Sequence, residues 1–399
     1  MIMMTKWDQK IKKVQKRLQS AGWDGWLLYD FRRTNDLACR FLEIPSEVLL
    51  TRRFFYWIPA EGETTKIVNR MESLPLSHAS GHVRAYSSYV ELEEQLKKTL
   101  KGCRKIAMEY SHLGAIPVVS KVDAGTIELI RSFGVEVESS ADILQESSVW
   151  TDEQLKGHIF AGSVLQQSVE DAWELIKKAI ERSENIDEAD VQAFLLSNFE
   201  RHGCVVEDPP ICAVNANSAD PHYIPTKKTA APIKRGDFLL IDVSCKKNLP
   251  QAVFADITRV AVIGTKPDIK QQNIFEIVKK ARDAALTLIK KRLKANLPIE
   301  GWEVDQVCRE EMIKAGYGKF FIHRTGHNIG ERVHGDGANI DNFETKDYRR
   351  LLPGTCFSIE PGIYLPGEFG IRLEDDIFLN KDGVSMQITK GMQTKIPSI

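Results

Sequence analysis

The sequence predicts two domains: an α/β domain over residues 1–145 and an α+β domain with pseudo-two-fold symmetric halves over residues 146–399. Strand and helix patterns alternate in the first 140 residues, which is typical of an α/β domain. A Ser-rich, acidic stretch at 138–154 then marks a boundary, and two similar hairpin patterns follow in the second half. A chain of 399 residues is long enough to bury two cores.

The first domain begins with a helix over residues 6–20, because apolar residues recur there at helical spacing and Gly22 follows. The strand patterns in this half are short apolar runs bounded by turn residues. We expect strands at 24–30, 104–110 and 134–138, two more within 52–69 around a turn at Glu61–Gly62, and a helix at 89–101.

In the second half, Thr151 can cap a long helix that runs to about Glu184, and a further helix at 187–203 ends at Gly203. The lysines of a helical stretch at 269–294 are interpreted as a solvated face. With 54 basic and 55 acidic residues, the charge balance predicts neither a nucleic-acid nor a membrane partner.

Four carboxylates repeat with a fixed spacing in the second half. Each copy is predicted as a strand that ends in an acid, a turn, and a returning strand that carries another acid fourteen residues later. The acids are Asp242 and Asp256 in one copy and Glu360 and Glu374 in the other, with Gly236 and Gly354 six residues before the first acid of each. Two such hairpins predict a domain whose acids gather between its halves.

Carboxylates gathered in apolar surroundings need compensating charge. One acid alone would more simply pair with a nearby base, and Arg259 and Arg372 are close in sequence. For four acids in matched hairpins, divalent cations are the better explanation. A carboxylate-rich site with one imidazole suits Mn²⁺, Co²⁺ or Fe²⁺, and two such ions about 3.5–4 Å apart serve hydrolysis.

The segment "HRTGHNIGERVHGDG" at 323–337 concentrates three histidines among glycines. His323 and His327 have the spacing of the zinc helix HExxH, but Arg324 stands where that motif has its glutamate. Neither GxxxxGK[ST] nor GxGxxG occurs here, which excludes a phosphate loop. The remaining interpretation is an irregular glycine-rich segment that brings imidazoles near the carboxylates.

Six motifs in this order resemble the pita-bread metallopeptidases: prolidase, aminopeptidase P and methionine aminopeptidase. The resemblance covers roughly residues 155–385, and the first 140 residues resemble the creatinase-type N-terminal domain that prolidase and aminopeptidase P carry. It implies a pita-bread (creatinase/aminopeptidase) catalytic domain. The motifs are "PHYIPT", "GDFLLIDVS", "FADITR", "HRTGHNIG", "SIEPGIY" and "GIRLEDD".

The resemblance implies two divalent metal ions, Mn²⁺ first and Co²⁺ or Zn²⁺ as alternatives, held by Asp242, Asp256, His327, Glu360 and Glu374. Glu360 would also be the general base for the bridging water. Further residues are implied around the substrate: His334 at the carbonyl oxygen, His222 on the substrate side, His323 near the proline pocket, Arg372 on the metal shell or a substrate carboxylate, and Tyr364 nearby.

The implied activity is hydrolysis of the Xaa-Pro bond, in dipeptides or at the N-terminus of longer peptides, by a homodimer. Two alternatives on the same fold are a creatinase-like amidinohydrolase, which needs no metal, and a non-catalytic peptide-binding module. All five ligand positions are filled, which argues against both.

Departures from the family pattern lie at the substrate border and put substrate length and selectivity in doubt. They are Ser244 in place of glycine, an Asp242–Asp256 loop about three residues longer than usual, Asn328 in "GHNIG", and the "HGDG" at 334–337. Seven cysteines without a CxxC pair, and no apolar leader or long apolar run, predict a cytoplasmic protein.

Overall fold

The computed structural model describes residues 5–389 and 391–399, and residues 1–4, on which part of the leader expectation rests, lie outside them. The chain divides into two compact units, Met1–Ser147 and Ser148–Ile399. Among the described residues, no helix has the length and apolar character needed to cross a membrane.

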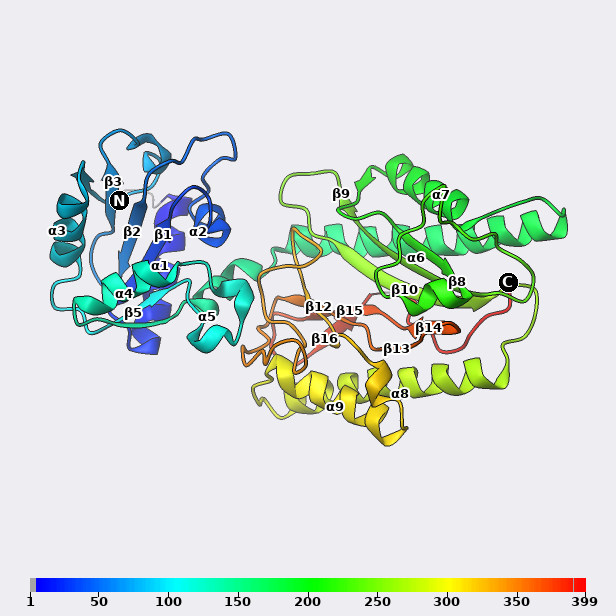
Figure 1. The fold of residues 1–399 in the computed structure, drawn as a ribbon. Coiled ribbons are helices and arrows are strands. Elements are labelled where there is room, and N and C mark those ends of the chain that lie inside the picture. The colour runs from blue at the N-terminus through cyan, green and yellow to red at the C-terminus, as the bar shows by residue number, and fades with distance from the viewer. Residues whose placement is uncertain (1–4, 390) are drawn as a thin grey trace. The chain divides into compact units, whose positions relative to one another are not determined.

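The first unit is a three-layer α/β structure around a mixed sheet of order β4-β3-β2-β1-β5-β6 (Figure 1). All residues of the central strand β1 are buried, because helices cover both faces. Trp26 and Leu28 pack on one side with α1 and α2, and Leu27 and Tyr29 pack on the other with α3 and α4. The elements are α1 Lys6–Ala21, β1 Gly25–Asp30, α2 Asp36–Phe41, β2 Phe54–Pro59, β3 Thr65–Asn69, β4 His82–Tyr86, α3 Tyr89–Thr99, β5 Lys105–Met108, α4 Ala124–Ser132, β6 Glu136–Ser139 and α5 Ala141–Leu144.

The helix predicted at 6–20 and the strands predicted in this half are confirmed. Gly22 ends α1 with a φ of 68°, a left-handed conformation that suits glycine. Strand β4 was not predicted, because its exposed edge position leaves it without the buried apolar pattern of the others.

Glu109, directly after β5, is fully buried and joins three parts of the first unit. Its carboxylate accepts hydrogen bonds from Trp26 Nε1 at 2.5 Å, Asn35 Nδ2 at 2.7 Å and Ser140 Oγ at 3.1 Å. Burial raises the pKa of this carboxyl from 4.5 to about 7. The raised pKa means that ionising Glu109 costs more free energy in the folded protein than in the unfolded chain.

We expect the first unit to lose stability as the pH rises. A carboxyl whose pKa is raised on folding contributes stability below its unfolded pKa, and that contribution disappears as the pH passes the folded value of about 7. The loss from this one group is on the order of 3 kcal/mol. Denaturant unfolding of wild type and Glu109→Gln at pH 5, 7 and 8.5 tests this: the variant should show the smaller decline, and parallel declines would contradict the assignment.

The second unit surrounds two strand groups with helices. Figure 1 shows α6 and α7 on one side of the strands and α8 and α9 on the other. Alternate residues of β9 face the two sides: Leu239 and Ile241 join the core with α6, and Phe238 and Leu240 the core with α8. The elements are α6 Asp152–Glu181, α7 Glu188–Arg201, β7 Cys204–Val205, β8 Ile211–Val214, β9 Phe238–Lys247, β10 Ala255–Val262, α8 Ile269–Lys294, α9 Gly301–Lys314, β11 Asn328–Ile329, β12 Cys356–Ile359, β13 Gly362–Leu365, β14 Phe369–Arg372, β15 Asp375–Leu379 and β16 Met386–Ile388.

The two acid-bearing hairpins are present, with corrections. Strands β9 and β10 pair antiparallel, but β9 continues through Asp242 to Lys247, so the prediction that the first strand ends at its acid is wrong. The reason is that residues beyond Asp242 pair with both β10 and β7. Strand β12 does end just before Glu360 and pairs with the returning β15, but the hairpin β13–β14 stands where a simple turn was predicted. Glu374 lies directly before β15, so the prediction that the returning strand carries this acid is wrong.

Candidate active site

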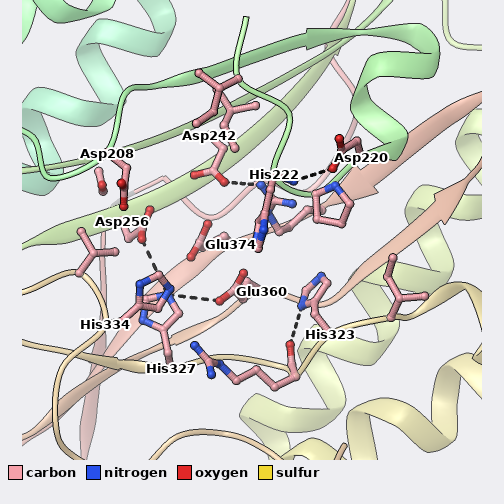
Figure 2. Close-up of a pocket in the computed structure, with 18 of the residues that line it drawn as sticks. Asp208, Asp220, His222, Asp242, Asp256, His323, His327, His334, Glu360 and Glu374 are labelled. Atoms are coloured by element: carbon pink, nitrogen blue, oxygen red, sulfur yellow. Dashed lines mark hydrogen bonds and ion pairs between the residues drawn. The ribbon is translucent and has the colours of Figure 1, made fainter. Parts of the chain in front are cut away.

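The second unit contains a cavity of about 790 Å³ whose walls carry most of the site residues singled out in the sequence. Figure 2 shows side chains from both hairpins around this space, with Glu360 between His327 and His323 in this view. The lining residues are Asp208, Pro209, Ile211, Asp220, Pro221, His222, Ile224, Asp242, Ser244, Asp256, Ile322, His323, Arg324, His327, Val333, His334, Glu344, Glu360, Arg372 and Glu374.

Three buried side chains at this cavity form a possible metal-binding cluster. One ligand atom each from Asp256, His327 and Glu374 lies within 4.8 Å of the others. Glu360 adjoins the cluster, because its Oε1 lies 3.3 Å from His327 Nε2, while Asp256 Oδ2 lies 3.9 Å from the same nitrogen. Three of the five predicted ligands are therefore gathered in one cluster and a fourth is beside it.

The cluster forms where the two hairpins meet. Asp256 is the second residue of β10, and Glu374 lies between β14 and β15, bridged to Thr258 across the halves. Thr258 Oγ1 donates a hydrogen bond of 2.7 Å to Glu374 Oε2. Because Thr258 is two residues after Asp256, both side chains leave β10 on the same face.

The electrostatics of the cluster fit a divalent cation. Burial and the other acids raise the pKa of both Asp256 and Glu374 well above the ordinary range. Asp256 Oδ1 is buried and has no hydrogen-bond partner among the described residues. Burial also lowers the pKa of His327 well below its usual value, which keeps the imidazole neutral, the state that binds metal. Carboxylates plus one neutral imidazole are a donor set for Mn²⁺, Co²⁺ or Zn²⁺.

Asp242 lines the same cavity but is engaged by Arg372 in a direct ion pair. Arg372 also donates to Tyr364 OH at 2.8 Å and to Thr258 Oγ1 at 3.1 Å. Arg259 pairs with Asp375 at 3.0 Å and donates to the backbone carbonyl of Glu374 at 2.7 Å. Among the described residues, Asp242 is thus paired with an arginine, whereas neither Asp256 nor Glu374 forms a side-chain ion pair with an arginine or lysine.

The remaining predicted residues lie around the cluster. His323 Nε2 and Tyr364 OH are 2.7 Å apart, and burial lowers the pKa of His323 to about 3. Tyr364 is 2% exposed and does not itself line the cavity. The ring of His334 lies 4.3 Å from that of His327, and His222 lies on the opposite wall (Figure 2).

Some residues of the site were not predicted. Ser358 Oγ accepts the backbone N–H of His327 at 2.9 Å and donates to Glu360 Oε1 at 3.1 Å. The sequence feature that could have identified Ser358 is its position two residues before Glu360, because side chains two residues apart in an extended chain point to the same face. Arg324 and the acids Asp208, Asp220 and Glu344 also line the cavity. Arg324 was not predicted as a cavity residue, because it was considered only as the replacement of the glutamate in the HExxH motif.

Cys245, next to Ser244, is buried and does not line the cavity. The neighbouring thiol of Cys204 and burial raise the pKa of Cys245, which keeps it protonated. A protonated, inaccessible thiol is not a nucleophile, in agreement with its interpretation as a passive neighbour.

An α/β domain followed by paired hairpins, with helices outside and a carboxylate–imidazole cluster between, defines the pita-bread class of proteins. Residues 160–381, more than half of the chain, match the model of metallopeptidase family M24. The chain belongs to that family.

Three similar proteins illustrate how far the likeness extends. The Xaa-Pro dipeptidase of Lactobacillus helveticus is 37% identical over 173 residues, which are 43% of this chain and 42% of that protein. The match thus spans less than half of that relative's length. Dipeptidase PepE from Mycobacterium ulcerans has a TM-score of 0.71 at 22% identity, covering 98% of both chains. The N-terminal domain of FACT complex subunit SPT16 from chickpea has a TM-score of 0.63 at 11% identity, again covering 98% of both. The fold is thus shared with a protein that is not named for an enzyme activity, and fold alone does not establish one.

Proposed function

We propose that the protein is a dinuclear-metal exopeptidase that hydrolyses the Xaa-Pro bond of dipeptides or of peptides with proline in the second position. The observation that carries the proposal is the cluster of Asp256, His327 and Glu374, with Glu360 beside it and Asp242 on the same cavity wall. Membership of a metallopeptidase family supports it. Two Mn²⁺ ions per chain are the proposed cofactors, with Co²⁺ or Zn²⁺ as substitutes, and a homodimer is the proposed assembly.

The proposed chemistry assigns each residue one task. Bound divalent ions would lower the pKa of a shared water toward neutrality. Burial raises the pKa of Glu360 to about 7, so its carboxylate can take a proton from that water and return it to the leaving proline nitrogen. His334, at the cavity wall beside His327, would donate a hydrogen bond to the carbonyl oxygen as charge develops there.

Substrate positioning falls to the surrounding residues. His222 and His323, which both line the cavity, would contact the substrate. Arg372 would hold Asp242 in place, since its guanidinium is occupied by Asp242, Tyr364 and Thr258. Arg372 would therefore orient a metal ligand, and a different residue would bind the substrate carboxylate.

Arg324 is the candidate for that carboxylate. It lines the cavity, its side chain is 24% exposed, and its contact with Glu344 is a loose 3.6 Å. A free C-terminal carboxylate of a bound dipeptide could therefore pair with it. A charged hydrogen bond contributes about 1.5–3 kcal/mol, which corresponds to roughly 10- to 100-fold in apparent affinity.

We expect Arg324→Ala to raise KM for an Xaa-Pro dipeptide about 10- to 100-fold, while KM for the same dipeptide amide changes by less than about threefold. Steady-state kinetics on the two substrates measure this difference. The matched control is Arg332→Ala, since Arg332 lies in the same segment, pairs with Glu207 and does not line the cavity. Equal increases on acid and amide would rule out carboxylate recognition by Arg324.

A length series from Xaa-Pro to Xaa-Pro-Yaa-Yaa, each with Mn²⁺, Co²⁺ and Zn²⁺, tests the proposed function itself. Metal-stimulated release of the N-terminal residue is expected. A creatinase-like amidinohydrolase would instead turn over its substrate without metal, and a peptide-binding module would bind the peptides without cleaving them.

A further inference from the structure

The start of β10, where Asp256 lies, is fixed from the side that faces away from β9. The backbone N–H of Asp256 donates a 2.7 Å hydrogen bond to Asp376 Oδ2, a side chain from β15. Two residues earlier, the carbonyl of Phe254 lies 2.8 Å from His158 Nδ1, a side chain from α6. The N–H of Phe254 in turn donates to the carbonyl of Gly330 at 2.9 Å.

These contacts replace a missing neighbouring strand. Residues 254 and 256 direct their backbone groups away from β9, toward the other half of the domain. In a continuous sheet, backbone groups of the next strand would satisfy them. Here Asp376 accepts the N–H of Asp256 and His158 contacts the carbonyl of Phe254, while the carbonyl of Gly330 accepts the N–H of Phe254.

The side chains of Asp376 and His158 lie close to each other, and both are buried. His158 Nε2 lies 3.1 Å from Thr389 Oγ1 and 3.9 Å from Asp376 Oδ2, and both residues are nearly inaccessible to solvent. Because a carbonyl oxygen can only accept, Nδ1 of His158 carries a proton, as one tautomer of the neutral imidazole does. Burial lowers the pKa of His158 to about 4, in keeping with that state.

Stability alone does not account for this arrangement. Burying a carboxyl and an imidazole is expensive, and apolar residues of similar volume often stabilise a core at least as well. Asp376 Oδ1 even has no hydrogen-bond partner among the described residues. What the arrangement does provide is a fixed backbone position for Asp256, whose carboxylate belongs to the cluster with His327 and Glu374.

We propose that Asp376 and His158 are positioning residues that hold the backbone of Asp256 so that its carboxylate is preorganised for metal. The inference rests on the proposed role of Asp256 as a metal ligand. Groups that orient a ligand from behind typically contribute 10- to 100-fold to metal affinity.

Mn²⁺ binding to the full-length, metal-stripped protein tests the proposal without reference to activity. Asp376→Leu keeps the volume but removes the acceptor for the Asp256 N–H, so the Kd for Mn²⁺ should rise about 10- to 100-fold. Asp376→Asn is the matched control, because its side-chain carbonyl still accepts that N–H. It should stay within about threefold of wild type. Circular dichroism checks that each variant is folded.

The outcomes are separable. If wild type takes up no Mn²⁺, the metal site and this inference are both overturned. If wild type binds Mn²⁺ and folded Asp376→Leu binds it equally well, the metal site stands and the positioning role is overturned. Should Asp376→Leu fail to fold, His158→Leu repeats the measurement from the other contact: a similar rise in Kd supports the proposal, and an unchanged Kd overturns it.

Discussion

Glu360→Gln should reduce kcat for proline release from an Xaa-Pro dipeptide by at least about 10³-fold, with KM within a few-fold of wild type. The amide cannot take the proton that the carboxylate accepts from water, and it cannot return one to the leaving nitrogen. The carboxylate lies 3.3 Å from His327 Nε2 and accepts a hydrogen bond from the Ser358 hydroxyl, so the change removes a charged group directly beside the cluster. Initial rates at saturating Mn²⁺ measure the effect.

Glu331→Gln is the control for this experiment. Glu331 lies in the glycine-rich segment 323–337, is exposed and does not line the cavity, so its variant should keep wild-type kinetics. A Glu360→Gln protein that retains more than a tenth of the wild-type kcat would show that the general base lies elsewhere.

Asp256→Asn should abolish stabilisation by Mn²⁺ and at the same time make the metal-free protein more stable at alkaline pH. Free metal at 100 times its Kd stabilises a folded protein by about 2.7 kcal/mol for one site, and the variant lacks a ligand common to the cluster. Folding raises the pKa of Asp256, so its contribution to stability is lost as the pH rises and the buried charge forms. The neutral amide has no such loss.

Thermal unfolding of both proteins at pH 6 and pH 8, with and without Mn²⁺, measures these two opposite effects. The variant's advantage in the metal-free state should be larger at pH 8. A Mn²⁺-induced shift in Tm equal to that of wild type would contradict the role of Asp256 as a ligand.

The sequence was most informative where local pattern and local structure coincide. The apolar spacing of residues 6–20 and the cap at Thr151 predicted helices that the structure contains. The matching offsets of Gly236, Asp242 and Asp256 and of Gly354, Glu360 and Glu374 predicted two hairpins, because a repeated spacing can be recognised without knowledge of the fold. Strand β9 extended further than predicted, because its end is determined by pairing with β7 and β10 rather than by its own residues.

Side-chain contacts between residues far apart in the chain could not be predicted from local sequence patterns. Arg372 is 130 residues from Asp242, and Asp376 is 120 residues from Asp256, yet both pairs are in direct contact. Nothing in the residues around His158 indicated that it faces the strand that carries a proposed ligand. The ligands lie in recognisable motifs, whereas the residues that hold them in place come from helices and strands outside those motifs.

Metal content and turnover measured on the same sample test the central claim most directly. The protein is stripped with a chelator, reloaded with increasing Mn²⁺, and assayed for proline released from an Xaa-Pro dipeptide at each step. The proposal predicts negligible turnover in the stripped protein, and full turnover once about two Mn²⁺ ions per chain are bound. Full-rate proline release by the metal-stripped protein would contradict it.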